Sequence, residues 1–437
     1  MQVDKITLQD IGLFDSEDHL GLAHHLNFCK SNGGKVQLDK YLYHPIGELS
    51  HIIERQKALE LFIQNMQQVD AMKITNGTCL VIEKFFETGF KTIPTQISLP
   101  SAYWYQFWNK ADYSLIQYSV EHLVLFIQSL MDFIALFEKA NDNPVIEKMV
   151  GNINKIIQHP QLASLKSKDK ITSPQQFLSL GYFFLYHYKN NIKILLDYFY
   201  DLDALYSLAK ANQIYHFQFP NWIDDSKPYL AVEQAVHPLV ENAVGNDLTL
   251  SPTKNFLFLT GANMAGKSTF IKTIGIVVYL SHIGMGAPAN KITMTVMDGL
   301  ITNLNIADNV VKGESYFYNE VQRIKNTLIK INDGKKNCVL IDELFKGTNI
   351  LDAMKCSTKV IEGLQKIRSS IFILSTHLYE ISDQLTKHQN IQFNYFETEV
   401  KDKQLHFQYH LTPGISQDRI GYLILEREGV VDLLDNI

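Results

Sequence analysis

Two long stripes of apolar residues run through the first half of the chain. In the first stripe, the apolar positions alternate at intervals of four and three residues: Ile116, Val120, Leu123, Ile127, Leu130, Ile134 and Phe137. This spacing is the 3.5-residue repeat of a helix that packs along another helix. At a rise of ~1.5 Å per residue, a helix of about 28 residues would reach roughly 40 Å. The pattern predicts a strut-like helix in an all-α region.

The second stripe follows a helix start signal. Ser173 is placed as an N-cap, Pro174 takes the first helical position, and Gln176 can complete a capping box. Apolar positions then recur at the same spacing: Ile192, Leu195, Phe199, Leu202, Tyr206 and Ala209. We expect the two helices to pair in an antiparallel bundle. Ordinary core packing explains both stripes more simply than direct contact with a ligand.

The pattern changes near residue 220. From Leu230 onward, short apolar runs alternate with amphipathic helical segments, which is typical of a parallel sheet with helical crossovers. The chain of 437 residues also exceeds the size at which a single core stops growing. We therefore expect an all-α domain with long helices over residues 1–230 and an α/β domain over residues 231–437.

A glycine-rich segment lies near the start of the expected α/β domain. The apolar run Phe256–Thr260 leads into the pattern GxxxxGKS, and a helical segment follows. In a P-loop, the glycines let backbone N–H groups face phosphates, and the helix N-terminus adds its dipole. We expect Lys267 to reach the β- and γ-phosphates and Ser268 to bind Mg²⁺. The candidate ATP-binding residues are Gly261, Ala262, Asn263, Met264, Ala265, Gly266, Lys267, Ser268 and Thr269.

Two further apolar runs end in polar residues. The run Cys338–Ile341 leads into Asp342 and Glu343, and the run Ile371–Leu374 leads toward His377. We expect Asp342 to join the magnesium shell and Glu343 to act as the catalytic base beside the attacking water. His377 is a candidate to hydrogen-bond the γ-phosphate or the water, and a purely structural histidine is the alternative. Adjacent carboxylates also occur in metal-only hydrolases, but no His/Asp cluster with ligand spacing accompanies this pair.

Composition and charge narrow the class of protein. The chain is 46% hydrophobic and 20% charged, with a formal net charge of −6. This balance argues against a broad basic face that covers nucleic acid, although a local basic patch remains compatible with it. The four cysteines show neither CxxC spacing nor the density of a disulfide-rich secreted domain. We expect reduced structural thiols in a cytoplasmic protein.

The chain also shows little sign of export or membrane insertion. The N-terminal sequence lacks the basic and then apolar run of a signal peptide. The uncharged run from Thr273 to Asn290 contains His282, Gly284 and Pro288, and it is marginal in length for a membrane span. It predicts a buried helix followed by a turn, and we expect no membrane association.

The order of these elements resembles the ABC superfamily, and the residues around them resemble the MutS family of DNA mismatch repair ATPases. The segment Thr260–Thr269 is similar to the motif TGPNMGGKST, with Ala262 and Ala265 in place of a proline and a glycine. The segments Asp342–Asn349 and Ser375–Glu380 resemble DE(L/I)GRGTS and ATHYxEL. The resemblance is specific after residue 237 and looser before it.

A fourth segment, Asn309–Glu320, resembles the family motif DLxxGRSTFMxEM. In the family, its serine completes the ATP site of the opposing subunit, so the resemblance implies that role for Ser315. Glu314 stands where the family has arginine, and Tyr316 stands where it has threonine. A negative charge near a partner's γ-phosphate is unfavourable unless it points away.

The resemblance implies an α/β P-loop ATPase domain of the ABC/MutS type, preceded by an all-α core/lever domain with long helices. Before residue 230 it rests on Leu42–Pro45, Glu54–Gln56 and Asp201–Ala209. The chain begins at about the family's core domain, so we expect the mismatch-reading wedge and the connector domain to be absent. An aromatic residue that would stack on adenine is not evident between His237 and Leu248.

The resulting expectation is a DNA-dependent ATPase that uses ATP and Mg²⁺ and forms a homodimer through its ATPase domain. It would act as an ATP-gated clamp or sensor of mismatched or branched DNA. The alternative is a nucleotide-dependent scaffold whose lever domain binds another protein, which the acidic balance and the missing DNA-reading domain favour. A transporter ATPase subunit fits less well, because an LSGGQ-type signature is missing.

Overall fold

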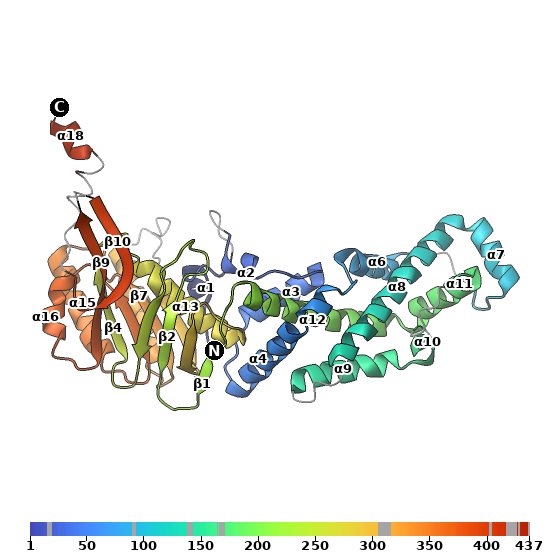
Figure 1. The fold of residues 1–437 in the computed structure, drawn as a ribbon, viewed down its shortest axis with the longest axis horizontal. Helices are drawn as coiled ribbons and strands as arrows, with labels where there is room; N and C mark the ends of the chain where they lie inside the picture. Colours follow the sequence, from blue (N-terminus) through green and yellow to red (C-terminus); the bar gives the residue numbers. More distant parts are fainter. Residues whose placement is uncertain are drawn as a thin grey trace. The chain divides into compact units, whose positions relative to one another are not determined.

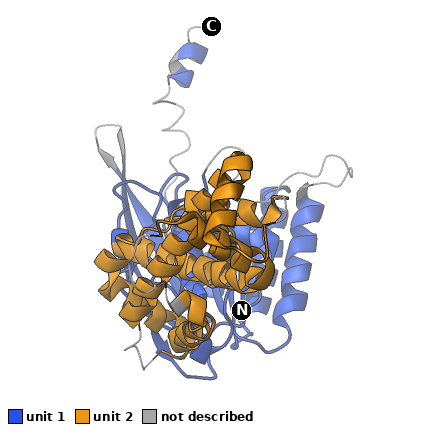
Figure 2. Cartoon of the chain, turned by 90° about the vertical axis from the view of Figure 1, so that its right-hand side faces the viewer, with its two compact units in different colours: residues 1–25, 44–53, 214–437 blue, residues 26–43, 54–213 orange. Residues whose placement is uncertain are grey.

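The computed structural model describes residues 1–14, 20–89, 93–137, 143–163, 165, 171–304, 316–401, 404–416, 426 and 429–435. These residues belong to two compact units, which Figure 2 shows in different colours. The sheet unit comprises residues 1–25, 44–53 and 214–437. The helical unit comprises residues 26–43 and 54–213.

This division differs from the expected boundary at residue 230, because N-terminal segments group with the sheet unit. Gln2 forms a parallel bridge to Gly299, the first residue of strand β6. Asp10 ends helix α1 (Lys5–Asp10) and accepts hydrogen bonds from the Thr302 hydroxyl at 2.7 Å and the Leu304 amide at 3.1 Å. Asp10 and Thr302 are 292 positions apart, so no local pattern in the sequence reveals this contact.

The helical unit is built from helices of very different lengths. Their bounds are α3 (Asn32–Tyr43), α5 (Met66–Asp70), α6 (Asn76–Glu87), α7 (Leu99–Trp108), α8 (Lys110–Phe137), α9 (Pro144–Ile157), α10 (Pro160–Ala163), α11 (Pro174–Tyr182) and α12 (Lys189–Ile214). Helix α4 (Leu49–Gln64) contributes its residues from 54 onward. The first predicted stripe is confirmed, because α8 is 28 residues long and all seven stripe residues are at most 3% exposed.

Helix α8 is also as long and as apolar as a membrane-spanning helix. Among the described residues, it is the one helix that could cross a membrane by length and composition. Half of its most apolar window is buried inside the structure. Core helices of compact proteins share these properties, and α8 packs against α6, α7, α9 and α11.

The second stripe is confirmed in its spacing but not as one helix. The capping box at Ser173 is present, and α11 begins at Pro174 as predicted. A π-helical turn over Phe183–His187 then separates α11 from α12. Phe126 of α8 and Phe199 of α12 meet edge to face, with ring centres 5.9 Å apart. The two stripes therefore share one core, although the second begins only after the π turn.

The strands of the sheet unit form two sheets within the described residues, and Figure 1 labels β1, β2, β4, β7, β9 and β10 among them. The six-stranded sheet has the order β10-β9-β4-β8-β7-β6, and the four-stranded sheet has the order β1-β5-β2-β3. Their bounds are β1 (Asn221–Ile223), β2 (Leu230–Ala235), β3 (Asn246–Leu250), β4 (Phe256–Gly261), β5 (Lys291–Thr295), β6 (Gly299–Asn303), β7 (Asn337–Asp342), β8 (Ile371–Ser375), β9 (Ile391–Lys401) and β10 (Gln404–Pro413). Strands β4, β8 and β7 are adjacent and parallel, so their carboxyl ends meet at one edge.

The sheet unit also contains several helices. Their bounds are α2 (Leu22–His25), α13 (Lys267–Ile283), α14 (Tyr316–Ile331), α15 (Ile350–Leu364), the 3₁₀ turn η4 (Tyr379–Ile381), α16 (Ser382–Leu385) and α18 (Val430–Asp435). The predicted buried helix is confirmed: every residue from Thr273 to Ile283 is buried, and α13 ends at Gly284 with a φ of 81°. Glycine fits this left-handed helix end without steric cost.

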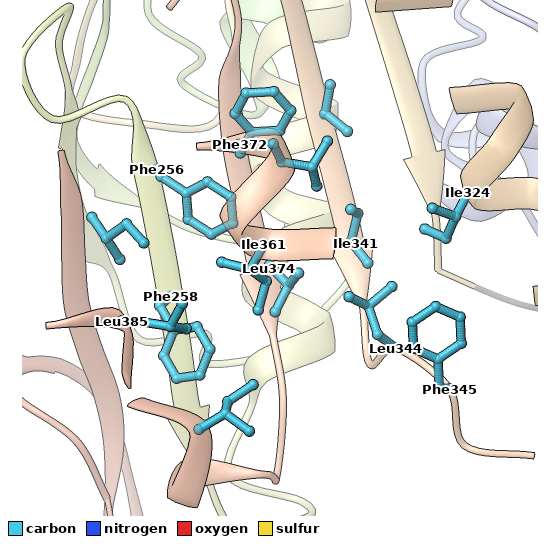
Figure 3. Packing of buried hydrophobic residues seen from close by; sticks show 14 of the residues in the cluster. Phe256, Phe258, Ile324, Ile341, Leu344, Phe345, Ile361, Phe372, Leu374 and Leu385 are labelled. Carbon is cyan, nitrogen blue, oxygen red and sulfur yellow. The ribbon is translucent and has the colours of Figure 1, made fainter. Parts of the chain in front are cut away.

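Alternate residues of the six-stranded sheet face different helices. Figure 3 shows the core on one face, where Phe256 of β4 and Phe372 of β8 pack with Ile361 of α15. The rings of Phe256 and Phe372 stack with centres 5.5 Å apart. On the other face, Leu340 of β7 lies against Gly275 of α13, where an added Cβ would come within 3.0 Å of its Cδ1. Helices therefore pack on both faces of strands β4, β8 and β7, as expected for a parallel sheet with helical crossovers.

Candidate nucleotide site

The glycine-rich loop joins β4 to α13 at the edge where the parallel strands end. Gly261 and Gly266 have φ values of 138° and 103°, a region that side chains rarely adopt. Met264 also has a positive φ, of 70°, and its side chain is exposed. Ala262 and Ala265 are buried, and neither has a positive φ. Alanine therefore fits at the two positions where this loop departs from the motif it resembles.

Lys267 lies inside this loop. Its ammonium donates hydrogen bonds to the carbonyl oxygens of Gly261 at 2.7 Å and Ala262 at 2.9 Å. Burial lowers the pKa of Lys267, while the carboxylates of Glu343 and Asp342 act in the opposite direction. The side chain thus presents a partly desolvated cation beside two carboxylates, at the start of α13.

Asp342 connects the ends of three strands. Its carboxylate accepts a hydrogen bond of 2.5 Å from the hydroxyl of Ser268, the second residue of α13, and another from the hydroxyl of Ser375 at the end of β8. The two predicted metal ligands, Ser268 and Asp342, are therefore neighbours. Both offer hard oxygen atoms, which suits Mg²⁺, an ion that takes few protein ligands and keeps several waters. In the part of the chain that the structure describes, no group of three or more His, Cys, Asp or Glu side chains offers another metal site.

Glu343 and His377 lie side by side, as the strand order requires. The Nδ1 atom of His377 is 3.4 Å from Oε2 of Glu343, and Lys346 brings its ammonium within 3.0 Å of the same oxygen. Glu343 has a φ of 57°, and its amide donates to the carbonyl oxygen of Ser375 at 3.0 Å. Burial by itself would raise the pKa of Glu343, but His377 and Lys346 together lower it to about 2. The carboxylate is ionised, and the side chains of His377 and Lys346 contact it. The contact with Lys346 did not follow from the sequence.

A cavity of about 490 Å³ extends from the glycine-rich loop. Part of its lining was predicted, namely Glu343 and the loop residues Ala262, Asn263, Met264, Gly266, Lys267, Ser268 and Thr269. The rest comes from Phe270 and Thr273 of α13 and from three other segments, which contribute Ala235, His237, residues 240–244, Asn246, Phe396 and Tyr409. Burial, with a smaller effect from the charge of Lys272, lowers the pKa of His237 to about 4. The cavity therefore combines a polar, charged end at the loop with an aromatic wall.

Tyr409 is the aromatic residue that the sequence did not reveal. It lies in β10, and a Cβ added at Gly266 would come within 3.2 Å of its ring. Tyr409 has a φ of 54° at an irregularity in the pairing of β10 with β9. Asn246 fixes this irregularity, because its side chain donates to the Tyr409 carbonyl at 3.0 Å and accepts from the Leu411 amide at 2.7 Å. A bulge changes which side chains face the cavity, so an alternating strand pattern could not place this ring.

The predicted site residues thus come together with one exception. The candidates from Gly261 to Thr269 form the loop and helix start, and Asp342, Glu343 and His377 lie beside it. Ser315, the residue expected to act on a partner's nucleotide, lies outside the described residues.

Known proteins include a domain that is similar to the second half of this chain. The family model for MutS domain V matches residues 257–432. The chain is 33% identical over 202 residues to a DNA mismatch repair protein MutS from Petrotoga mobilis. The matched region covers 45% of this chain and 24% of that protein. It is 31% identical over 224 residues to the protein of that name from Anaplasma phagocytophilum, and the match covers 51% of this chain and 27% of that protein.

A third relative, from Carboxydothermus hydrogenoformans, carries the same name and is 30% identical over 236 residues, covering 52% of this chain and 28% of that protein. The chain thus spans about a quarter of the length of the curated relatives it matches. Residues 257–432 therefore match MutS domain V, and the relatives named DNA mismatch repair protein MutS are similar to about half of this chain.

Proposed function

We propose that this protein binds ATP with Mg²⁺ at the cavity described above and hydrolyses it to ADP and phosphate. The observation that carries the proposal is the convergence of side chains from three adjacent parallel strands. Lys267 and Ser268 follow β4, Asp342 ends β7 and Glu343 follows it, and His377 follows β8. Phosphoryl transfer depends on positioning and on charge stabilisation, and this arrangement supplies both.

The chain's own residues have distinct roles in this proposal. Lys267 and the amides of the glycine-rich loop hold the β- and γ-phosphates, and Ser268 and Asp342 hold the magnesium ion. The bound ion would neutralise phosphate charge. Glu343 orients the attacking water and accepts its proton, since its carboxylate is ionised and its side chain is 16% exposed. His377 donates a hydrogen bond to the γ-phosphate or the water. Tyr409 stacks on the adenine, because its ring lines the cavity beside the glycine-rich loop.

Steady-state turnover and nucleotide affinity test this proposal directly. Wild-type protein should release phosphate from ATP only when Mg²⁺ is present. Lys267→Ala should lose ATP binding, measured with a fluorescent ATP analogue. A wild-type protein that neither binds ATP nor turns it over would refute the proposal.

The proposal extends to DNA and to a second subunit. The relatives are named as DNA mismatch repair proteins, and we propose that this protein binds mismatched or branched duplex DNA and acts as an ATP-gated homodimer. Ser315 of one subunit would complete the site of the other. We also propose a cytoplasmic location. Binding to perfect, mismatched and branched duplexes should be measured at several salt concentrations, because the salt dependence reports the number of phosphates contacted. Failure to bind any of these DNAs would remove this part of the proposal.

A second candidate function is a nucleotide-dependent scaffold, and helix α7 favours it. Trp104, Phe107 and Trp108 of α7 are 68%, 77% and 67% exposed. The rings of Trp104 and Trp108 stack with centres 6.0 Å apart, and α7 contains no charged residue. Exposed clusters of large aromatic side chains are typical of protein interfaces, and an uncharged helix offers nothing to phosphates.

Affinity capture distinguishes the scaffold from the DNA-binding protein. The full chain would be immobilised and used to capture binding partners in the presence of ADP or of a nonhydrolysable ATP analogue. A scaffold should retain a protein partner in one nucleotide state, lose it in the Trp104→Ser/Trp108→Ser variant, and show no affinity for DNA. DNA binding that survives this double substitution would exclude α7 as the functional surface.

A further inference from the structure

Glu320 is a buried carboxylate that the proposed reaction does not use directly. It lies in the second turn of α14 and is 2% exposed. Its two carboxylate oxygens accept hydrogen bonds from the backbone amides of Lys346 at 3.0 Å and Gly347 at 3.2 Å. A buried carboxylate is unfavourable unless such donors satisfy it. Glu320 therefore ties α14 to the loop that follows β7.

This loop has a backbone that needs support. Glu343 and Phe345 have φ values of 57° and 60°, and a bulky residue rarely adopts this conformation. Such backbones persist where surrounding contacts determine them. Helix α14 supplies two contacts, because the ring of Phe317 lies 5.6 Å from that of Phe345 and Glu320 binds the next two amides.

The backbone position of Lys346 places its side chain near Glu343. Lys346 is three residues after Glu343, and its ammonium lies 3.0 Å from the Glu343 carboxylate. A lysine side chain is flexible, and 40% of this one is exposed. The position of the Lys346 backbone limits which groups its ammonium can reach, and Glu320 binds the amide of that residue.

We propose that Glu320 is a positioning residue, which holds Lys346 against Glu343 and thereby orients the carboxylate that acts on the water. This inference rests on the proposed ATPase function for its catalytic consequence. The structural claim, that Glu320 holds the loop after β7, does not depend on ATP turnover. His377 and Lys267 also interact with Glu343, and neither residue is changed by substitutions at Glu320.

The test compares Glu320→Gln with Thr327→Val. Gln keeps the shape of the side chain but turns an amide NH₂ group toward one of the two backbone donors. Thr327 is a matched control, because it is also buried on α14 and accepts a hydrogen bond from Asn303 at 3.0 Å, away from the loop. Amide hydrogen exchange at Lys346 and Gly347 should accelerate in Glu320→Gln and stay unchanged in Thr327→Val.

Turnover provides the second measurement. Glu320→Gln should lower kcat by about tenfold or more with little change in the KM for ATP, because the phosphate-binding loop is untouched. Adding Lys346→Ala to Glu320→Gln should cost little further, since both changes remove the same contact.

Two results would overturn the inference: unchanged amide exchange in Glu320→Gln, or equal losses of kcat in Glu320→Gln and Thr327→Val. Absence of turnover in the wild-type protein would refute the ATPase proposal alone, because the exchange measurement would still decide whether Glu320 holds the loop.

Discussion

The hydroxyl of Ser268 donates a hydrogen bond of 2.5 Å to the carboxylate of Asp342, although 74 positions separate the two residues in the chain. The contact exists because β4 and β7 flank β8 in a parallel sheet, so the residues that follow them meet at one edge. An oxygen pair of this kind suits Mg²⁺. We expect Ser268→Ala to raise the Mg²⁺ concentration for half-maximal turnover by about tenfold, the effect of losing one contact to a charged group. Ser281→Ala in the same helix is the control, because the Ser281 hydroxyl donates to the Val277 carbonyl at 2.7 Å and does not line the cavity. An unchanged Mg²⁺ requirement in Ser268→Ala would contradict the assignment.

Glu343→Gln tests the catalytic base. Glutamine keeps the size of the side chain but cannot accept the proton of the water. Turnover should fall by about 100-fold or more, the usual contribution of a general base, while ATP binding is retained. Glu362→Gln is the matched control, because Glu362 pairs with Lys387 at 2.9 Å in a surface ion pair. Equal turnover in wild type and Glu343→Gln would show that another group activates the water.

Tyr409 should determine affinity for the base of the nucleotide. Tyr409→Ala removes the ring and should weaken ATP binding by about tenfold, since stacking between an aromatic ring and a base is worth about 1–3 kcal/mol. Tyr409→Phe keeps the ring and should bind ATP almost normally. Titration with a fluorescent ATP analogue measures both. If the two variants lose affinity equally, the hydroxyl rather than the ring is the important group.

Asp10 should stabilise the sheet unit from outside the predicted ATPase domain. Asp10→Ala leaves the buried hydroxyl of Thr302 and the amide of Leu304 without their acceptor. We expect a loss of about 2 kcal/mol or more in the free energy of unfolding, measured by urea titration. Asp4→Ala is the control, because Asp4 forms a partly exposed ion pair with Lys330. Equal stability of the two variants would contradict the role given to the N-terminal segment.

His282 should make the protein less stable in acid. It is fully buried in α13, its Nε2 accepts from the Met297 amide at 3.0 Å, and its Nδ1 lies 2.9 Å from the Val278 carbonyl. Burial lowers the pKa of His282 from 6.5 to about 4. The folded state therefore favours the neutral ring, so this contribution to stability is complete above pH 6.5 and declines as the pH falls toward 4. The loss reaches up to about 3 kcal/mol.

Urea unfolding at several pH values measures this dependence. His282→Gln should be less stable at neutral pH but should lose less stability between pH 6.5 and 4. His237, whose pKa burial lowers to about 4, leaves a residual slope in this variant. His51→Gln is the control, since the side chain of His51 is 61% exposed. An unchanged slope in His282→Gln would show that the ring is already protonated in the folded protein.

Local patterns in the sequence were sufficient for the elements themselves. The spacing from Ile116 to Phe137 predicted α8, and the capping residues at Ser173 predicted the start of α11. These features are local because a helix is defined by residues three and four apart. The sequence did not predict the π turn over Phe183–His187, since a π turn has no comparably strong local pattern.

The candidate residues followed from the sequence for a related reason. Phosphate binding requires backbone amides in a glycine-rich turn, and polar residues after parallel strands meet at one edge of the sheet. Lys267, Ser268, Asp342, Glu343 and His377 were therefore identified from their positions after apolar runs, and the structure places them together.

Only the tertiary structure decided the contacts between distant segments. Asp10 reaches β6, the pairing irregularity at Tyr409 turns a ring toward the glycine-rich loop, and Glu320 binds the amides that follow Phe345. Each contact depends on strand register or on packing between residues far apart in the chain, which periodicity does not encode. The sequence by itself determined which chemical groups the protein has at this site, whereas the fold determined what holds those groups in place.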